Sequence, residues 1–209
     1  MKIERLAPSK KVKGRYLVHL DEGTILRVSQ QEILDFGLHQ GKELSVEEAQ
    51  VLEQAGGKSQ LKERGLQILS RKSVSRRDLE RKLAEKDGGE EEIAEICDRF
   101  EELGLINDER YALQLARHYS NKGYGERKIT QELYAHGVPR EFWEDALADL
   151  DDGSDGIDRF LTQKLKGQKP DQKQLKKVTD ALARRGFSWS DIRAGVVRYD
   201  QSIAEMWED

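Results

Sequence analysis

An internal repeat constrains the fold of this 209-residue chain more than any other feature. Apolar residues recur in register at a period of about 50 residues, within the range typical of stacked supersecondary units. The aligned columns are Leu61/Tyr111/Phe160, Leu66/Ala116/Leu165, Leu79/Ile129/Val178, Leu83/Leu133/Leu182, Ile93/Trp143/Ile192 and Phe100/Leu150/Tyr199. The spacing within each copy is helical, so the repeat predicts three units of three helices with these columns facing the core.

The middle copy shows where its helices begin and end. Gly104 is predicted to end one helix, since glycine accepts the left-handed conformation at a C-terminus, and Asn107 or Asp108 to cap the next. Gly123–Gly125 then separate that helix from another one, which ends at Gly137. Two helices joined by a glycine hinge therefore form the centre of the unit.

The predicted fold class is mainly α: tandem three-helix repeats in a curved elongated array, with a small N-terminal β-hairpin plus helices. The expected boundaries are 1–60 for this N-terminal head, 61–106 and 107–153 for units one and two, and 154–209 for unit three with an acidic tail. The clearest linker is Asp151–Gly156, and the tail contains Asp200, Glu205, Glu208 and Asp209.

The head combines β-rich runs with capped helices. Residues 1–13 are basic and expected to be frayed, whereas Arg15–Leu20 and Thr24–Val28 are predicted to pair as a hairpin. Ser29 and Ser45 each precede a glutamate by three residues, a capping-box pattern that predicts two helix starts.

The sequence Gly56-Gly57-Lys58-Ser59 resembles the end of a phosphate-binding loop. That loop requires a glycine five positions before Gly57 and a preceding strand, but Leu52 and a predicted helix stand there. We therefore interpret the two glycines as a helix end followed by a flexible link.

Composition argues for a cytoplasmic protein without a membrane segment or cofactor. The single cysteine, Cys97, excludes an internal disulfide, and no run approaches the 18 apolar residues of a membrane span. The four histidines, His19, His39, His118 and His136, have no partner at metal-ligand spacing. No nucleophile elbow or dinucleotide fingerprint occurs, so we expect no catalytic, cofactor or metal residues and no enzyme.

Charge points to a partner-binding surface. The net charge is −4, yet the stretch from Lys164 to Arg185 holds eight basic residues against two acidic ones. Each unit places basic residues on or near its second helix, so stacking would align them along one face. For any single residue a solvated surface explains the charge better, and only the repeated placement favours a binding surface. The candidate partner-binding residues are Arg71, Arg76, Arg77, Arg81, Arg117, Lys122, Arg127, Lys128, Lys173, Lys177 and Arg184.

Two segments carry a resemblance to a known family. They read LSRKSVSRRDLERKL and EELGLINDERYALQLARHYSNKGYGERKITQELYAHGV, and they resemble the RecX family of bacterial recombinase regulators. Leu103–Ala112 and Lys122–Val138 match the family pattern almost throughout, whereas unit three matches it least.

The resemblance implies a regulator that binds along the RecA filament on single-stranded DNA. It would restrain ATP hydrolysis and strand exchange without catalytic residues. Independently of the resemblance, we expect a monomer, and the spread lysines and arginines predict weak DNA binding without sequence preference. The alternative is a helix-turn-helix transcription regulator, because Ser75–Ile106 could pass for the helical part of a winged domain. A wing would require a β-pair after Ile106, where Asn107 is instead predicted to begin a helix.

Overall fold

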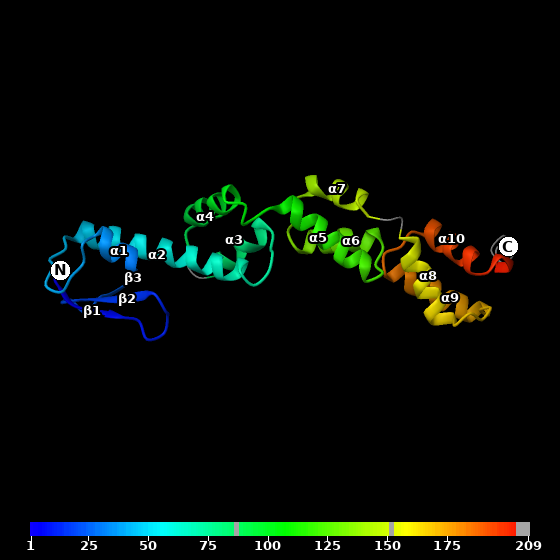
Figure 1. Ribbon diagram of the computed structural model, residues 1–209, viewed down its shortest axis with the longest axis horizontal. Helices are drawn as coiled ribbons and strands as arrows, with labels where there is room; N and C mark the ends of the chain where they lie inside the picture. Colours follow the sequence, from blue (N-terminus) through cyan, green and yellow to red (C-terminus); the bar gives the residue numbers. More distant parts are fainter. Residues whose placement is uncertain (86–87, 151–152, 204–209) are drawn as a thin grey trace. The chain divides into compact units, whose positions relative to one another are not determined.

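The computed structural model describes residues 1–85, 88–150 and 153–203 (Figure 1). The chain divides into two compact units. The first contains residues 1–73 and 79–105, and the second contains residues 74–78 and those from 106 onward. Asp151 and Asp152 of the expected linker, and the acidic tail from residue 204, lie outside the described residues.

A three-stranded antiparallel sheet opens the first unit. Its strands β1 (Ile3–Pro8), β2 (Arg15–Leu20) and β3 (Ile25–Ser29) lie in the order β1-β2-β3. The predicted hairpin is therefore confirmed, whereas the expectation of a frayed segment at residues 1–13 is wrong. Ile3 is fully buried in the sheet's core, and this long-range pairing with β2 orders a segment whose own charged sequence gives little local signal.

Two capped helices follow the sheet. They are α1 (Gln30–Asp35) and α2 (Val46–Leu69). Both predicted capping boxes are confirmed, because the hydroxyls of Ser29 and Ser45 each accept a hydrogen bond from the N–H of the glutamate three residues on.

The predicted helix end at Gly56–Gly57 is wrong, because α2 continues through both glycines and across the boundary expected after residue 60. Packing against the sheet explains the continuity. A Cβ at Gly56 would lie 2.3 Å from the backbone oxygen of Arg27, so only glycine lets β3 lie this close to the helix. The contact compensates for the intrinsic cost of glycine in a helix, about 1 kcal/mol.

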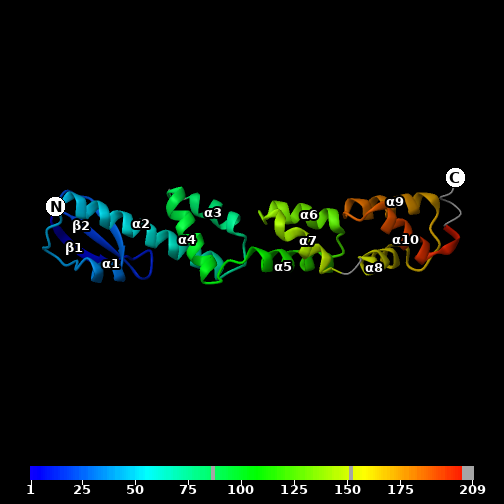
Figure 2. The same ribbon diagram turned by 90° about the horizontal axis from the view of Figure 1, so that it is seen from above.

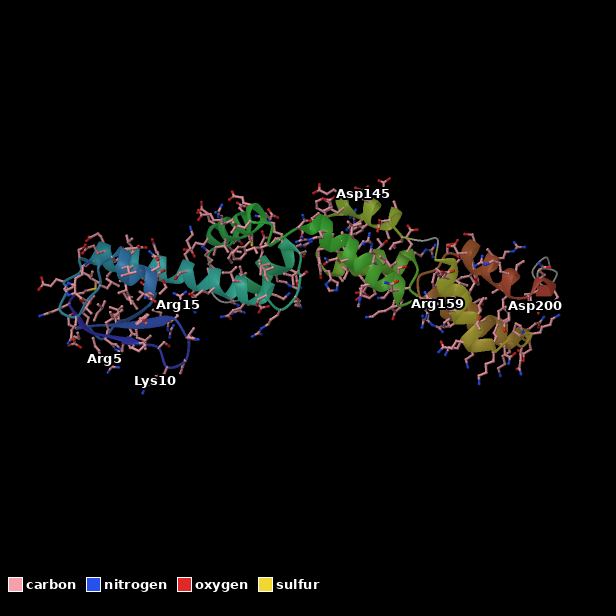
Figure 3. All side chains as sticks on the ribbon, viewed as in Figure 1. Arg5, Lys10, Arg15, Asp145, Arg159 and Asp200 are labelled. Atoms are coloured by element: carbon pink, nitrogen blue, oxygen red, sulfur yellow. The ribbon has the colours of Figure 1, made fainter. Side chains whose placement is uncertain are left out.

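A buried arginine fastens the sheet to α2. Arg15 is 4% exposed and lies between the sheet and the helix (Figure 3). Its Nε donates to a Glu63 carboxylate oxygen at 3.0 Å, and its Nη1 donates to Ser59 Oγ at 2.7 Å. These bonds balance a charge that would otherwise be costly to bury.

The rest of the first unit adds α3 (Arg76–Ala84) and α4 (Glu90–Glu102) to the C-terminal half of α2. Gly65 of α2 faces Phe100 of α4, since a Cβ there would lie 2.6 Å from the phenyl ring. Leu66 is 40% exposed, so the expectation that it faces the core is wrong. Gly65 occupies the interior position instead, and a pattern of apolar side chains does not predict it because glycine has no side chain.

The second unit holds two further groups of three helices (Figure 1). The first group is α5 (Asp108–Asn121), α6 (Glu126–Ala135) and, after a 3-10 turn at Arg140–Phe142, α7 (Trp143–Ala148). The second group is α8 (Ser154–Leu165), α9 (Gln172–Arg184) and α10 (Trp189–Tyr199). Each group encloses its own apolar cluster.

The repeat predicted from the sequence is confirmed by burial. All six residues of the two central columns are buried, and the most exposed of them, Val178, has only 6% of its surface accessible. Asn107 caps α5 as expected, and Gly104 before it has a φ of +67°. The chain is therefore mainly helical with tandem three-helix repeats, and the curvature of the array stays a prediction.

Candidate functional site: the basic ridge of the second helices

The second helices of neighbouring repeats meet end to end. The N–H of Gly125, which precedes α6, donates to the carbonyl of Arg185 at 2.9 Å, and the N–H of Arg127 donates to the carbonyl of Gly186 at 3.2 Å. Arg185 and Gly186 follow the last turn of α9. The N-terminus of α6 therefore abuts the C-terminus of α9, and Figure 2 shows the two helices following one another. Free N–H groups at one helix end satisfy free carbonyls at the other.

Glycine is required on both sides of this α6–α9 joint. A Cβ at Gly125 would lie 2.5 Å from the backbone nitrogen of Phe187 and 2.6 Å from the carbonyl carbon of Gly186. Gly186 has a φ of +91°, and a Cβ there would lie 2.4 Å from the nitrogen of Lys128. Both contacts involve backbone atoms, which cannot rotate away.

The side chain of Arg185 clamps the α6–α9 joint. Its Nη1 donates to the carbonyl of Gly123 at 3.2 Å. The guanidinium lies 5.6 Å from the ring centre of Tyr124 and 4.8 Å from that of Phe160, within the range of cation–π attraction. This arginine belongs to the basic stretch of unit three, but its role in the structure is to hold two repeats together.

Residues 74–78, which belong to the second unit, contact the end of α6. Ser75 accepts a hydrogen bond from the N–H of Asp78 at 3.1 Å, and its hydroxyl donates to the carbonyl of His136 at 2.6 Å. His136 caps the C-terminus of α6, and its Nδ1 lies 3.1 Å from the Tyr111 hydroxyl. The N-cap residue of one second helix thus contacts the C-cap residue of the next.

Because the helices repeat in register, one outward position recurs in all three. It stands two residues before the buried column Leu79, Ile129 and Val178, which is a rotation of about 200° from that core position. Arg77, Arg127 and Lys176 occupy this position, and all three are exposed. We call these three residues the basic ridge. Lys176 was not among the residues predicted from sequence, although the register of the repeat alone identifies it.

Other predicted site residues flank the ridge on the same helices. Lys128 is half-buried, and its Nζ forms an ion pair with Glu132 at 2.7 Å. Its hydrogen bond to Glu132 holds the pKa of that carboxyl below its ordinary value, and burial only partly opposes the effect. The N–H of Arg76 donates to Asp108 at 2.9 Å. The exposed flanking residues are Arg81 on α3, Lys173 and Lys177 on α9, and Arg184 at its end.

Three predicted residues lie elsewhere. Arg71 follows the C-terminus of α2. Arg117, on α5, forms an ion pair with Asp149 at 2.7 Å, and Lys122, which ends α5, lies 5.4 Å from the ring centre of Tyr119. The predicted residues therefore divide between the second helices and these three, which lie outside the ridge.

In the described part of the chain, no group of three or more His, Cys, Asp or Glu side chains is arranged to hold a metal ion. None of its helices is both long and apolar enough to cross a membrane.

Comparison with known proteins gives consistent matches. Residues 107–147 match the family profile described as "RecX, second three-helix domain", and residues 159–195 match "RecX, third three-helix domain". The regulatory protein RecX of Xanthomonas axonopodis pv. citri is 36% identical over 141 residues, which cover 66% of this chain and 86% of the relative. The RecX protein of Neisseria meningitidis is 32% identical, over 71% of this chain and 95% of its own length.

Solved structures agree with the sequence matches. A crystal structure of a regulatory protein RecX superposes with a TM-score of 0.67 at 26% identity, covering 92% of this chain and 98% of that one. RecX from Lactobacillus salivarius superposes with a TM-score of 0.64 at 27% identity, covering 70% of this chain and 99% of that one.

Proposed function

Since this chain belongs to the RecX family of regulatory proteins, we propose that it binds the filament of RecA on single-stranded DNA and inhibits its activity. The inhibited activities are ATP hydrolysis and strand exchange. The resemblance seen in the sequence supplies this partner, and the basic ridge supplies the surface that would meet it.

The observation that carries the proposal is the end-to-end stacking of the second helices. A filament presents the same surface again and again, and the basic ridge presents the same charge once in each repeat. Linked contacts of this kind gain from effective concentration, so each can be weak by itself. Within the second unit, the hydrogen bonds of Gly125 and Arg127 to Arg185 and Gly186 join α6 to α9, so these two repeats support the ridge together.

On DNA alone we expect weak binding without sequence preference. The ridge residues and their neighbours are lysines and arginines spread over helices, a pattern that contacts phosphates and not base edges. Binding should therefore weaken steeply with salt, as counterion release requires.

The transcription-regulator alternative gains no support from the structure. A winged domain needs a β-pair after α4, but Asn107 caps α5 there and the N–H of Arg110 donates to its side chain at 2.6 Å. The segment from Ser75 to Ile106 therefore leads into another helix of the repeat.

The proposal is tested by titrating the protein into a RecA reaction with single-stranded DNA and measuring ATP hydrolysis. The hydrolysis rate should fall as the protein is added. An unchanged rate, together with nanomolar binding to a preferred palindromic duplex in physiological salt, would instead establish a transcription regulator.

A further inference from the structure

A second basic surface lies in the first compact unit. A groove of about 1100 Å³ runs along the C-terminal half of α2. Val12 reaches it from the β1–β2 loop, Arg27 from β3, and Lys82 from α3. None of the three ridge residues lines it. Arg71, one of the partner-binding residues predicted from the sequence, does line it. We call this site the hairpin groove.

Positive charge dominates the hairpin groove. Among the described residues, three carboxylates line it against five basic side chains, Arg27, Arg64, Arg71, Lys72 and Lys82. Two of these carboxylates already have arginine partners. Glu63 accepts from the buried Arg15 at 3.0 Å, and Glu85 lies 3.9 Å from Arg64.

Three of these basic side chains have no acidic partner among the described residues. Among the described residues Arg27, Arg71 and Lys72 form no ion pair. All three are exposed, so they are available to a ligand entering the groove. These uncompensated positive charges would attract a negatively charged ligand.

The β1–β2 loop extends this positive surface. Lys10, Lys11 and Lys13 are exposed on both sides of Val12, and Figure 3 shows Lys10 on the loop. The N–H groups of Lys11 and Val12 donate to the Ser9 hydroxyl at 3.3 and 3.2 Å, so the loop has a defined turn. No acidic residue occurs anywhere from residue 5 to residue 20. A preformed lysine loop therefore stands at the rim of the groove.

The dimensions favour a single nucleic-acid strand. From Arg64 to Arg71 the chain makes close to two helical turns, about 10 Å along the axis. That length corresponds to roughly three nucleotides at about 3.4 Å each along one DNA strand. The volume is near the upper end of that of small-ligand sites, so it holds a few nucleotides of one strand. Guanidinium and ammonium groups supply phosphate contacts, and none of the described residues that line the groove is aromatic and able to stack on a base.

We propose that the hairpin groove binds the phosphate backbone of single-stranded DNA and is an anchoring site separate from the basic ridge. The choice of DNA over RNA rests on the proposed function, because a protein that works on a DNA filament meets single-stranded DNA beside it. The groove holds one part of that strand, while the ridge meets the RecA filament on DNA.

The test measures binding of a short fluorescent oligothymidine by anisotropy, in the absence of RecA. In the double variant Arg71→Glu/Lys72→Glu the affinity should fall roughly tenfold, and the slope of log affinity against log salt should decrease by about 0.7 for each lost phosphate contact. Lys62→Glu/Arg159→Glu is the matched control. It changes the net charge equally, and its two exposed residues lie outside the groove and the ridge. The control should bind like the parent.

The other arms identify the ligand. Arg71→Gln/Lys72→Gln, which removes charge without reversing it, should show a smaller loss in the same direction, and thermal melts should show both groove variants folded. Equal binding by groove variant and control would overturn the proposal. Tighter binding of a duplex, or of oligouridine, would overturn its assignment to single-stranded DNA. Because RecA is absent, a negative result here leaves the ridge hypothesis standing, and a failure to inhibit RecA leaves groove binding standing.

Discussion

Replacing Gly125 by alanine should destabilise the second unit, although the backbone conformation of Gly125 is open to alanine. The φ of Gly125 is −86°, a value that alanine adopts freely, so the change should by itself stabilise the chain by about 0.4–1 kcal/mol through the unfolded state. In the structure, however, the new methyl group would lie 2.5 Å from the nitrogen of Phe187. The α6–α9 joint must open to admit it.

The size of the effect follows from what the joint loses. Opening it breaks two hydrogen bonds, from the N–H groups of Gly125 and Arg127 to Arg185 and Gly186, each contributing about 1 kcal/mol. Overpacking adds about 1–3 kcal/mol. After subtracting the gain in the unfolded state, we expect a net loss of about 2–4 kcal/mol.

Urea unfolding followed by circular dichroism measures this loss. The control is Gly57→Ala, a glycine inside α2 whose added methyl group would meet no atom within 4 Å. That variant should gain up to about 1 kcal/mol from helix propensity. If Gly125→Ala proved as stable as the parent, the end-to-end joint would not exist as described.

Three further predictions concern packing and charge. Leu133→Ala should cost about 2–5 kcal/mol in unfolding free energy, because the side chain is fully buried; a loss below 1 kcal/mol in a urea titration would contradict its core position. Gly56→Ala should destabilise the head in thermal melts, although the neighbouring Gly57→Ala stabilises it, because only the methyl group at Gly56 meets β3. Lys128→Gln should raise the pKa of Glu132 toward its ordinary value. A carboxyl with a lowered pKa stabilises the fold above its unfolded-state pKa and loses that contribution as the pH falls through its folded-state pKa. The variant's Glu132 should therefore titrate at higher pH by NMR, and an unchanged titration would exclude the Lys128 contact.

Local patterns predicted the repeat correctly because its signals are short-range. The central columns, such as Ile129 and Leu133, are spaced by one helical turn, and that spacing alone identifies the buried face. Capping by Ser29 and Asn107 likewise depends on residues within three positions. All residues that produce these patterns lie within or next to a single helix, so the sequence alone predicts them.

The features that sequence missed depend on partners distant in the chain. Strand β1 forms because it pairs with β2, and α2 continues through Gly56 because β3 packs on it. Gly65 replaces Leu66 at the core because Phe100 fills the space of its missing side chain. The sequence near each of these residues therefore does not predict the distant segment that packs against it.

The candidate site was predicted in outline and not in detail. Basic second helices were recognised from charge, and Arg77 and Arg127 lie on the ridge. Arg185 lies in the same basic stretch, yet its side chain binds Gly123 and two aromatic rings. Charge alone cannot distinguish a surface arginine from one that joins repeats. The register of the repeat, in contrast, identifies Lys176 as a ridge residue.

The most direct test of the central claim is inhibition of RecA's ATP hydrolysis by ridge variants. Each single reversal, Arg77→Glu, Arg127→Glu or Lys176→Glu, should change the half-inhibitory concentration by no more than about fivefold, since an exposed charge contributes at most about 1 kcal/mol. The triple reversal should lose far more than any single change, because linked contacts are lost together. A control triple, Lys62→Glu/Arg159→Glu/Arg193→Glu, changes the net charge equally at exposed positions off the ridge and should inhibit like the parent. If the folded ridge triple inhibits as well as this control, the ridge is solvated surface and the account is wrong.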